Sequence, residues 1–383
     1  MKVIDGKEWV CLREICEEAA VLPGPEGQVR AKAVYFSSMD ALHKGAMHFA
    51  GYFSDLHSRG MVYGSSDPDA FYFDPACGDL HVRADAAVAA EGTAVEPDAA
   101  VMNEFLAPEL VEALSGDEEG RETACWTVET DWYFMAVFLF EYFYHTGSPF
   151  EGKQMVNHCF LSPAEKELFR AREGIFCMEP GSHDNSPVPG IQDKLIRFWK
   201  EYPEDLGKMF QKAFLSGGSL IHLRPTEIDW KQSVVRLMMD YKDCSCGFHG
   251  YSAKLISKED GTRVCPGCGK VYYPMSDGLD WILLSAGARL YECQTGLNAF
   301  DTETVTGQVV ENRNRKGLFG IKNVSDGVWR GFFPNRETKE ITKGMAIPIW
   351  SGMTLRFERG EDWTLRMTAF SEESEDDNHE QAE

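Results

Sequence analysis

The sequence is short of positive charge. Its 383 residues include 38 Lys and Arg against 61 Asp and Glu, which gives a formal net charge of −23 at pH 7. DNA, RNA and anionic membranes are bound through basic surfaces, so this charge balance argues against nucleic acid and membrane as partners.

Long apolar runs are also lacking. No stretch reaches the roughly 20 apolar residues that a membrane-spanning helix needs, and the first residues show no secretory signal pattern. We therefore expect a cytoplasmic protein. With 43% hydrophobic and 12% aromatic residues, the chain can bury a large core, and its length predicts two or three domains.

The strongest apolar stretch runs from Asp131 to His145, within ETDWYFMAVFLFEYFYHTGSPFEG at residues 129–152. Nearly every position in it is apolar or aromatic, so a helix here would have no polar face and must be enclosed by protein on all sides. Gly147-Ser148-Pro149 closes the stretch, and Ala107-Pro108-Glu109 precedes it. The pattern predicts a fully buried central helix.

This arrangement resembles the C-terminal lobe of a protein kinase, and three further segments fit in order. Tyr63–Ala70 (YGSSDPDA) stands where kinases have H-R-D-L-K-P-E-N, and Ala84-Asp85-Ala86 stands where they have D-F-G. Leu220–Trp230 (LIHLRPTEIDW) matches their Arg-Pro-Ser/Thr segment. The resemblance implies a mainly helical kinase C-lobe-like domain over residues 37–238.

The resemblance also implies two contacts that maintain such a lobe. Arg224 is expected to form a buried ion pair with Glu109, because the arginine of the Arg-Pro-Ser/Thr segment pairs with the glutamate of Ala-Pro-Glu in the family. Asp131 is expected to hydrogen-bond the backbone of the Tyr63–Ala70 loop.

The residues that perform phosphoryl transfer are missing at the matching positions. The reaction needs a carboxylate base, an Asn and an Asp for magnesium, and a strand Lys with a glycine-rich loop for the triphosphate. Ser65, Ala70 and Ala84 stand at the base, asparagine and first metal-carboxylate positions, and a one-residue shift would bring Asp85 to the last of these. Without such oxygens magnesium has no hard ligands. The resemblance therefore implies a pseudokinase.

Little sequence precedes the lobe. Only Met1 to about Ser37 is available for the small sheet lobe of a kinase, and neither the glycine-rich loop nor the lysine motif occurs in the chain. We expect residues 1–36 to be an N-terminal extension with a strand and a short helix, covering surface that the small lobe would otherwise bury.

Local patterns predict the other elements of this lobe. Apolar residues recur every three or four positions from Met39 to Leu56, which predicts an amphipathic helix capped by Ser37 or Ser38. Further helices are expected at Leu161–Arg170, Gln192–Lys200 and Pro203–Leu215, and a hairpin is expected to turn at Ala76-Cys77-Gly78. His43, His48 and His57 on or near the long helix are expected to be solvated or core-edge residues rather than ligands or catalysts.

Four of the 11 cysteines have metal-ligand spacing. Cys244 and Cys246 lie about twenty residues before Cys265-Pro-Gly-Cys268-Gly. A CPxCG turn presents two thiolates, and a second pair across a hairpin completes a tetrahedral zinc site, so we predict a zinc ribbon over residues 241–275. His249 is an alternative to Cys244 as the fourth ligand. Four protein ligands imply structural zinc, and the other cysteines are expected to be reduced core residues.

The C-terminal part has a β pattern. After a linker or short helix expected at Ser276–Ala286, short alternating strands with glycine turns predict an all-β sandwich over residues 287–370. The segments GIKNVSDGVW, ITKGMAIPI and SGMTLRFE (residues 320–329, 341–349 and 351–358) resemble the C-terminal half of a forkhead-associated domain. Residues 371–383 (SEESEDDNHEQAE) are predicted to be a disordered acidic tail.

Forkhead-associated domains read phosphothreonine through Arg and Ser in loops at one end. Here Asn312 to Lys316 (NRNRK) is the basic cluster of the sandwich, but the Gly-Arg and Ser-x-x-His motifs of the family are missing. The resemblance therefore implies the fold. For the basic cluster two interpretations stay open: Arg313 and Arg315 bind a phosphopeptide, or the cluster is a simple solvated turn.

The sequence as a whole predicts a multidomain α+β protein: a kinase C-lobe-like domain, a small zinc ribbon and a forkhead-associated-like sandwich. This order resembles bacterial kinase-like proteins found with von Willebrand A-domain proteins and metal-dependent phosphatases in stress and defence signalling. It implies a non-catalytic signalling scaffold that binds such protein partners. The alternatives are a divergent phosphotransferase that uses Asp67, Asp69 or Asp85 with a partner chain, and a phosphopeptide-reading adaptor.

Overall fold

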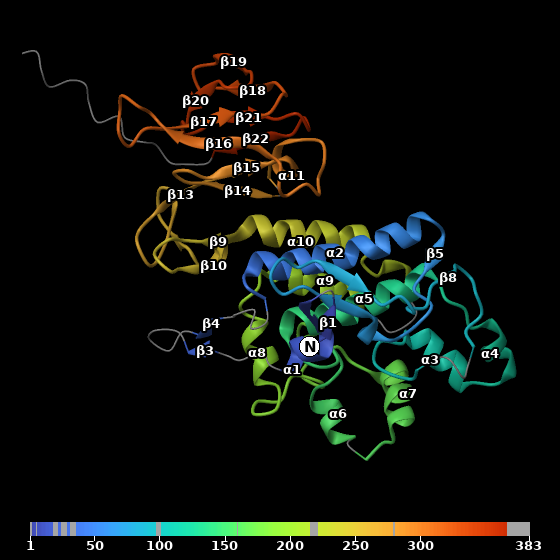
Figure 1. Cartoon of the computed structure of the whole chain (residues 1–383). Helices are drawn as coiled ribbons and strands as arrows, with labels where there is room; N and C mark the ends of the chain where they lie inside the picture. Colours follow the sequence, from blue (N-terminus) through green and yellow to red (C-terminus); the bar gives the residue numbers. More distant parts are fainter. Residues whose placement is uncertain are drawn as a thin grey trace, which may run out of the picture. The chain divides into compact units, whose positions relative to one another are not determined.

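The computed structural model describes residues 2–4, 6–17, 22–23, 29–30, 36–96, 101–158, 160–214, 221–278 and 280–365. The predicted acidic tail at 371–383 lies outside these residues. The chain mixes helix and sheet and divides into two compact units, Met1–Val234 and Val235–Glu383 (Figure 1).

Helices dominate the first unit. They are α1 (Leu12–Glu17), α2 (Met39–Ser58), α3 (Pro108–Ser115), α4 (Glu118–Thr123), α5 (Val128–Tyr144), α6 (Lys153–Asn157), α7 (Pro163–Glu173), α8 (Asp193–Phe198), α9 (Glu204–Phe214) and α10 (Glu227–Asp240), whose last residues belong to the second unit. Ser38 caps α2 through its side chain, as predicted. The three helices expected between residues 161 and 215 are α7, α8 and α9. No helix in the described part of the chain is both long and apolar enough to cross a bilayer.

Helix α5 is the predicted central helix. All its residues from Tyr133 to Tyr144 are buried, and α1, α2, α8 and α9 pack around it (Figure 1). Phe49 of α2 stacks on Phe138 with ring centroids 4.1 Å apart, and Phe210 of α9 meets Phe140 at 5.3 Å. Aromatic rings on opposite sides of the helix thus replace the solvent that an amphipathic helix would face.

The N-terminal segment joins a sheet built around the predicted hairpin. The strands β1 (Lys2–Ile4), β2 (Lys7–Cys11), β6 (Phe71–Phe73) and β7 (Leu80–Val82) form one antiparallel sheet in this order. The β6–β7 turn lies where it was predicted: Asp74 Oδ1 accepts the Ala76 amide at 2.8 Å, and Gly78 has φ +79°. Short two-residue strands make up the other pairs of this unit, β3 (Leu22–Pro23) with β4 (Val29–Arg30) and β5 (Met61–Val62) with β8 (Ala89–Ala90).

The second unit is built from antiparallel strands. They are β9 (Tyr241–Asp243), β10 (His249–Tyr251), β11 (Ile256–Ser257), β12 (Arg263–Val264), β13 (Val271–Ser276), β14 (Trp281–Leu284), β15 (Arg289–Tyr291), β16 (Val305–Glu311), β17 (Phe319–Asn323), β18 (Trp329–Phe332), β19 (Thr338–Ile341), β20 (Ala346–Pro348), β21 (Thr354–Arg356) and β22 (Asp362–Leu365), with one short helix α11 (Glu292–Thr295). One sheet has the order β11-β12-β13-β22-β21-β18-β19, with β14 also paired to β13, and the other has the order β15-β16-β17-β20. Strands β9 and β10 form a separate hairpin.

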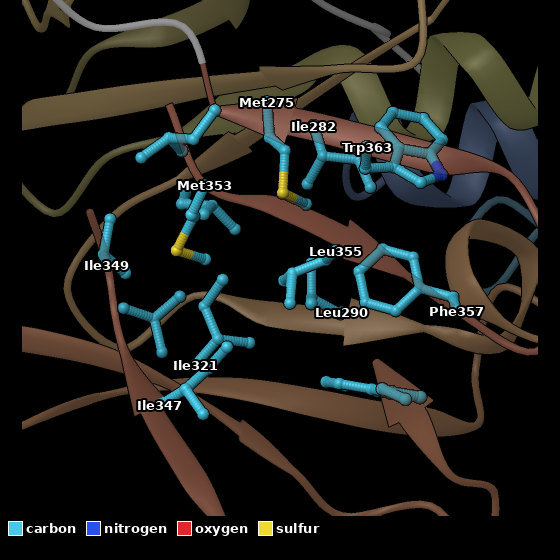
Figure 2. Close-up of a cluster of buried hydrophobic side chains, with 14 of the residues drawn as sticks. Met275, Ile282, Leu290, Ile321, Ile347, Ile349, Met353, Leu355, Phe357 and Trp363 are labelled. Carbon is cyan, nitrogen blue, oxygen red and sulfur yellow. The ribbon is translucent and has the colours of Figure 1, made fainter. Parts of the chain in front are cut away.

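Side chains from the two larger sheets meet in one buried cluster. Figure 2 shows Met275, Ile282 and Leu355 of the first sheet facing Ile321 and Ile347 of the second. Alternate residues of each strand enter this cluster, as expected when one face of a sheet is buried.

The linker or short helix expected at Ser276–Ala286 is wrong. Residues Trp281–Leu284 form β14, which pairs with β13 from Tyr273↔Leu284 to Ser276↔Trp281. Strand β13 also pairs with β22 through Met275↔Leu365. Ile282 and Leu284 are buried in the core of the sheets, so tertiary packing makes a strand of a short apolar run whose local pattern fits either type of element.

Candidate functional site

The predicted ion pair between Arg224 and Glu109 is present. The two guanidinium nitrogens of Arg224 donate to the two carboxylate oxygens of Glu109 at 2.7 and 2.8 Å. The Arg224 side chain is 6% exposed and that of Glu109 is 26% exposed. Arg224 also donates to the backbone oxygen of Glu129 at 2.9 Å and lies over the ring of Tyr133. The bidentate pair therefore ties the segment before α10 to the start of α3, and the bond to Glu129 adds the start of α5.

The predicted contact of Asp131 with the loop is also present. The Tyr63 amide donates to Asp131 Oδ2 at 2.8 Å, so the buried carboxylate at the start of α5 fixes the first residue of the Tyr63–Ala70 loop. Both contacts implied by the resemblance thus occur in the first unit.

His57 completes a network around Asp131 that no local sequence pattern indicates. His57 Nε2 lies 3.0 Å from Asp131 Oδ2, and His57 Nδ1 lies 3.0 Å from Glu227 Oε2, which also accepts Trp132 Nε1 at 2.8 Å. Burial acts to lower the pKa of His57, but the two carboxylates outweigh it and raise the pKa to about 9. His57, which is half-buried, is thus a structural cation at the edge of the core, in line with the core-edge position expected for it.

Ser65, Ala70 and Ala84 stand at the positions that the resemblance matches to the base and metal ligands of kinases. The hydroxyl of Ser65 accepts the Asp67 amide at 3.1 Å, which closes a local turn. Ala70 is fully buried, and Ala84 is exposed. Neither alanine side chain carries an oxygen that could bind a metal ion.

The three aspartates of the phosphotransferase alternative are bound to arginines. Arg83 contacts Asp67 at 3.1 Å and Asp85 at 2.6 Å, and its guanidinium holds the pKa of Asp85 below the usual range. Arg13 of α1 contacts Asp69 at 2.8 Å. Two arginines therefore compensate part of the charge of these three carboxylates.

Two groups of metal-ligating side chains occur in the described ranges, and neither includes those aspartates. One group is Asp74, Cys77 and Asp79 in the β6–β7 turn, where Asp74 already accepts Lys7 Nζ at 3.3 Å and the Ala76 amide. The other is the predicted cysteine set.

Arg83, two residues before Asp85, was the sequence signal that could have indicated that Asp67 and Asp85 are paired with an arginine.

The four predicted cysteines converge. The Sγ atoms of Cys244, Cys246, Cys265 and Cys268 all lie within 4.8 Å of one another. Cys244 and Cys268 are 3.6 Å apart, and Cys246 and Cys265 are 3.5 Å apart. Tetrahedral zinc with Zn–S bonds of about 2.3 Å needs sulfur separations of about 3.8 Å. These four side chains could therefore hold a metal ion.

Two similar turns bring the cysteines together despite their different spacing. The Gly247 amide donates to the Cys244 oxygen at 2.8 Å and the Gly269 amide to the Cys265 oxygen at 2.9 Å, and both glycines have positive φ. A Cβ on Gly267 would lie 2.8 Å from Cys246 Sγ, so glycine at this position lets the two turns approach without displacing that sulfur. The C-x-C pair thus presents its sulfurs as the CPxCG turn does.

His249 stands apart from the sulfur cluster. Its Nδ1 lies 2.9 Å from Asp243 Oδ1 in an exposed pair, and it is not a member of the four-residue group. The backbone amide of Cys246 holds the pKa of the Cys244 thiol down at about 7, which favours the thiolate that a metal binds. The geometry favours Cys244 over His249 as the fourth ligand.

No protein-family model and no curated protein match the chain. Among solved structures, it is similar to the kinase PK-1 of Cydia pomonella granulovirus, at 14% identity and a TM-score of 0.35, over 57% of this chain and 63% of that chain. It is also similar to a Toxoplasma gondii rhoptry antigen kinase domain, at 13% identity and a TM-score of 0.31, over 50% of this chain and 43% of that chain. The chain spans less than two thirds of either structure. Both neighbours are kinases, and at these scores neither assigns an activity to this chain.

Proposed function

We propose that this chain is a non-catalytic signalling scaffold whose first unit is a kinase-like lobe. The observation that carries the proposal is the state of the catalytic positions. The two lobe-maintaining contacts, Arg224–Glu109 and Asp131–Tyr63, are present. Residues that would hold magnesium and accept a proton are absent from the matching positions, where Ser65 closes a turn and Ala70 fills the core.

The N-terminal segment supports the same proposal. Strand β2 pairs with β6, directly after the Tyr63–Ala70 loop, and Arg13 of α1 binds Asp69 within that loop. Val10, Leu12 and Ile15 of this segment are all buried. In the proposed scaffold, residues 2–17 cover this face of the lobe, and nucleotide chemistry has no role there.

Nucleotide binding tests the proposal against a divergent phosphotransferase. The full chain is titrated with a non-hydrolysable ATP analogue, with and without magnesium, and melting temperature and calorimetric heat are followed together. A ligand at 100 times its Kd would stabilise the protein by about 2.7 kcal/mol, which a melt resolves. The scaffold predicts no shift and no heat.

A magnesium-dependent shift would overturn the scaffold proposal. In that case Asp67→Asn and Asp85→Asn would identify the metal ligands by removing the shift, with Asp184→Asn, an exposed aspartate in another loop, as the matched control. An active kinase carried through the same titration shows that the assay detects binding.

The proposed cofactor is structural zinc on Cys244, Cys246, Cys265 and Cys268, because four thiolates suit zinc and leave no open coordination position. The proposed partners, by resemblance, are a von Willebrand A-domain protein or a metal-dependent phosphatase. Light scattering of this chain mixed with a purified candidate partner tests the assignment. A complex that persists in chelator-free buffer supports the scaffold. If the chain and each candidate partner stay separate in every mixture, the partner assignment is contradicted.

A phosphopeptide-reading adaptor remains the second candidate, through the two-sheet part of the second unit, which we propose is forkhead-associated-like. Arg313 and Arg315 are exposed in the β16–β17 turn. Asn312 Oδ1 accepts the amides of Asn314 and Arg315 at 2.8 and 3.2 Å, which orders that turn. Binding of phosphothreonine peptides that is lost in the Arg313→Ala, Arg315→Ala double variant would favour this function. Unchanged or absent binding would favour a solvated turn.

A further inference from the structure

The first unit contains a cavity of about 500 Å³ beside the C-terminal end of α5. Helix α1, the loop around Asp69 and residues 190–194 complete its walls. Leu12, Phe105 and Ile191 give these walls an apolar part. The volume falls within the range of small-ligand pockets, about 300–1,000 Å³.

Two buried polar atoms at this cavity have no partner in the described part of the chain. They are Glu141 Oε1 and His145 Nδ1, and both residues line the cavity. Glu141 is 6% exposed and His145 is 4% exposed. Glu141 belongs to the last turn of α5 and His145 is the residue that caps its C-terminal end, so both stand at the same end of the helix. An unsatisfied buried polar group costs about 1–3 kcal/mol, so such a pair indicates a missing hydrogen-bonding partner.

The two unpartnered atoms are suited to a ligand that donates hydrogen bonds to them. Burial lowers the pKa of His145 to about 4, so its ring is neutral, and its hydrogen bond with the Ile15 backbone leaves Nδ1 as the free acceptor. Glu141 Oε1 is a carboxyl oxygen. A ligand with two or more N–H groups at one end can satisfy both.

The charges around the cavity favour a cation. Four carboxylates line it, and two basic side chains accompany them. Of these two, Arg13 binds Asp69, and Lys194 Nζ donates to the Cys16 backbone oxygen at 3.0 Å. Glu104 and Glu141 form no ion pair with the described residues. Burial raises the pKa of both carboxyl groups, and a bound cation would restore their ionised forms.

We infer that this cavity binds a small organic cation with an apolar body, a primary amine or an amidine. The cationic head donates to Glu141 Oε1 and His145 Nδ1 and is compensated by Glu141 and Glu104. The apolar body lies against Leu12, Phe105 and Ile191. Because α1 forms one wall, the bound cation also links the N-terminal segment to α5. The inference does not depend on whether the lobe is catalytic.

Titration calorimetry of the full chain with benzylamine tests the site, with benzyl alcohol as the uncharged probe of the same shape. We expect benzylamine to bind at least tenfold more tightly than benzyl alcohol. Glu141→Gln keeps the side-chain shape but cannot ionise, so it should weaken benzylamine binding at least tenfold. Asp184→Asn, an exposed residue that does not line the cavity, should leave binding unchanged.

A second variant and a second readout locate the bound probe. Ile191→Trp adds bulk to an exposed wall residue without touching the buried polar pair, and it should also abolish binding. Hydrogen exchange should show added protection of the Leu12–Cys16 amides when benzylamine is bound. Absence of binding by the unaltered protein would overturn the inference, because the cavity would then hold only water. Equal binding of the alcohol, or unchanged affinity in Glu141→Gln, would also overturn it, because charge would then play no part in recognition.

Discussion

The first unit and the cysteine hairpins of the second differ in what supplies their stability. Helix α5 is enclosed by aromatic rings, and its polar contacts are specific pairs set into a large apolar core. The buried cluster at the hairpins has five residues, and two of them are the cysteines Cys244 and Cys265. A core this small offsets little of the conformational entropy of its loops, which is why we propose that bonds to a metal contribute. Removing one polar pair should therefore weaken the first unit, whereas removing the metal should unfold the hairpins.

Metal removal should have the largest effect. Structural zinc contributes about 10–16 kcal/mol of binding free energy in zinc-finger peptides. We expect the purified protein to contain about one zinc ion per chain, and either a strong chelator or Cys265→Ser to abolish hydrogen-exchange protection over residues 244–270. The amides of α5 should keep their protection.

Cys125→Ser serves as the control for that experiment, because Cys125 is half-buried and lies outside the sulfur cluster. Metal-free protein with protected hairpin amides would contradict the comparison between the two regions.

Arg224→Ala should lower the free energy of unfolding of the first unit by about 3 kcal/mol. The substitution breaks the ion pair and leaves the largely buried carboxylate of Glu109 without its partner. Urea unfolding followed by tryptophan fluorescence measures this change. The control is Arg59→Ala, whose pair with Asp55 has side chains that are 58% and 68% exposed, and it should cost less than about 1 kcal/mol. Equal effects of the two substitutions would show that burial does not decide the contribution.

The His57 network should make the stability of the first unit depend on alkaline pH. The folded-state pKa of about 9 lies above the usual 6.5, so the stabilisation is fully present below pH 6.5 and is lost as the pH rises through 9. The slope between these values is at most about 1.4 kcal/mol per pH unit. Unfolding titrations at intervals from pH 6 to 10 measure it.

The pH-dependent loss should disappear in His57→Gln and persist in His158→Gln, since His158 is exposed and outside the network. A flat profile in the unaltered protein would mean that His57 is neutral, and that Asp131 keeps the shared proton.

Gly267→Ala should have the smallest effect of the four changes. The added methyl group would lie 2.8 Å from Cys246 Sγ, so the turns must separate slightly, and we expect about tenfold weaker zinc binding, or about 1.4 kcal/mol. Competition with a chromophoric chelator measures the affinity. Ser245→Ala changes an exposed residue of the other turn and should bind zinc normally. Unchanged affinity in Gly267→Ala would mean that the sulfur set tolerates a wider geometry.

Features with a local signal were predictable from the sequence. The apolar run at 131–145 predicted α5, and the resemblance to kinases gave the contacts of Asp131 and Arg224. The cysteine spacing predicted the sulfur cluster even though the first pair is C-x-C. In each case the information lies in one short segment or in a match that already joins two segments.

Features set by distant partners were not predictable. His57 and Glu227 are 170 positions apart, and neither residue has neighbours that indicate the other. Strand β14 follows from pairing with β13 and from the core around Ile282, and its short apolar run favours no single element. The sequence did contain a signal for Glu141. It is the lone carboxylate after Asp131 in an otherwise apolar helix, and burying an ionisable group costs free energy unless it has a partner.

Strand β13 has a consequence for how the second unit can be divided. It pairs with β12 of the cysteine region on one edge at Val271 and Tyr272, and with β14 and β22 further along. The predicted zinc ribbon and the predicted sandwich therefore share a strand, and no boundary in the chain separates them. A cut at residues 276–287 would strip β13 of its β14 neighbour and leave open strand edges that invite aggregation. Shuffling these parts between proteins would have to move them as one piece.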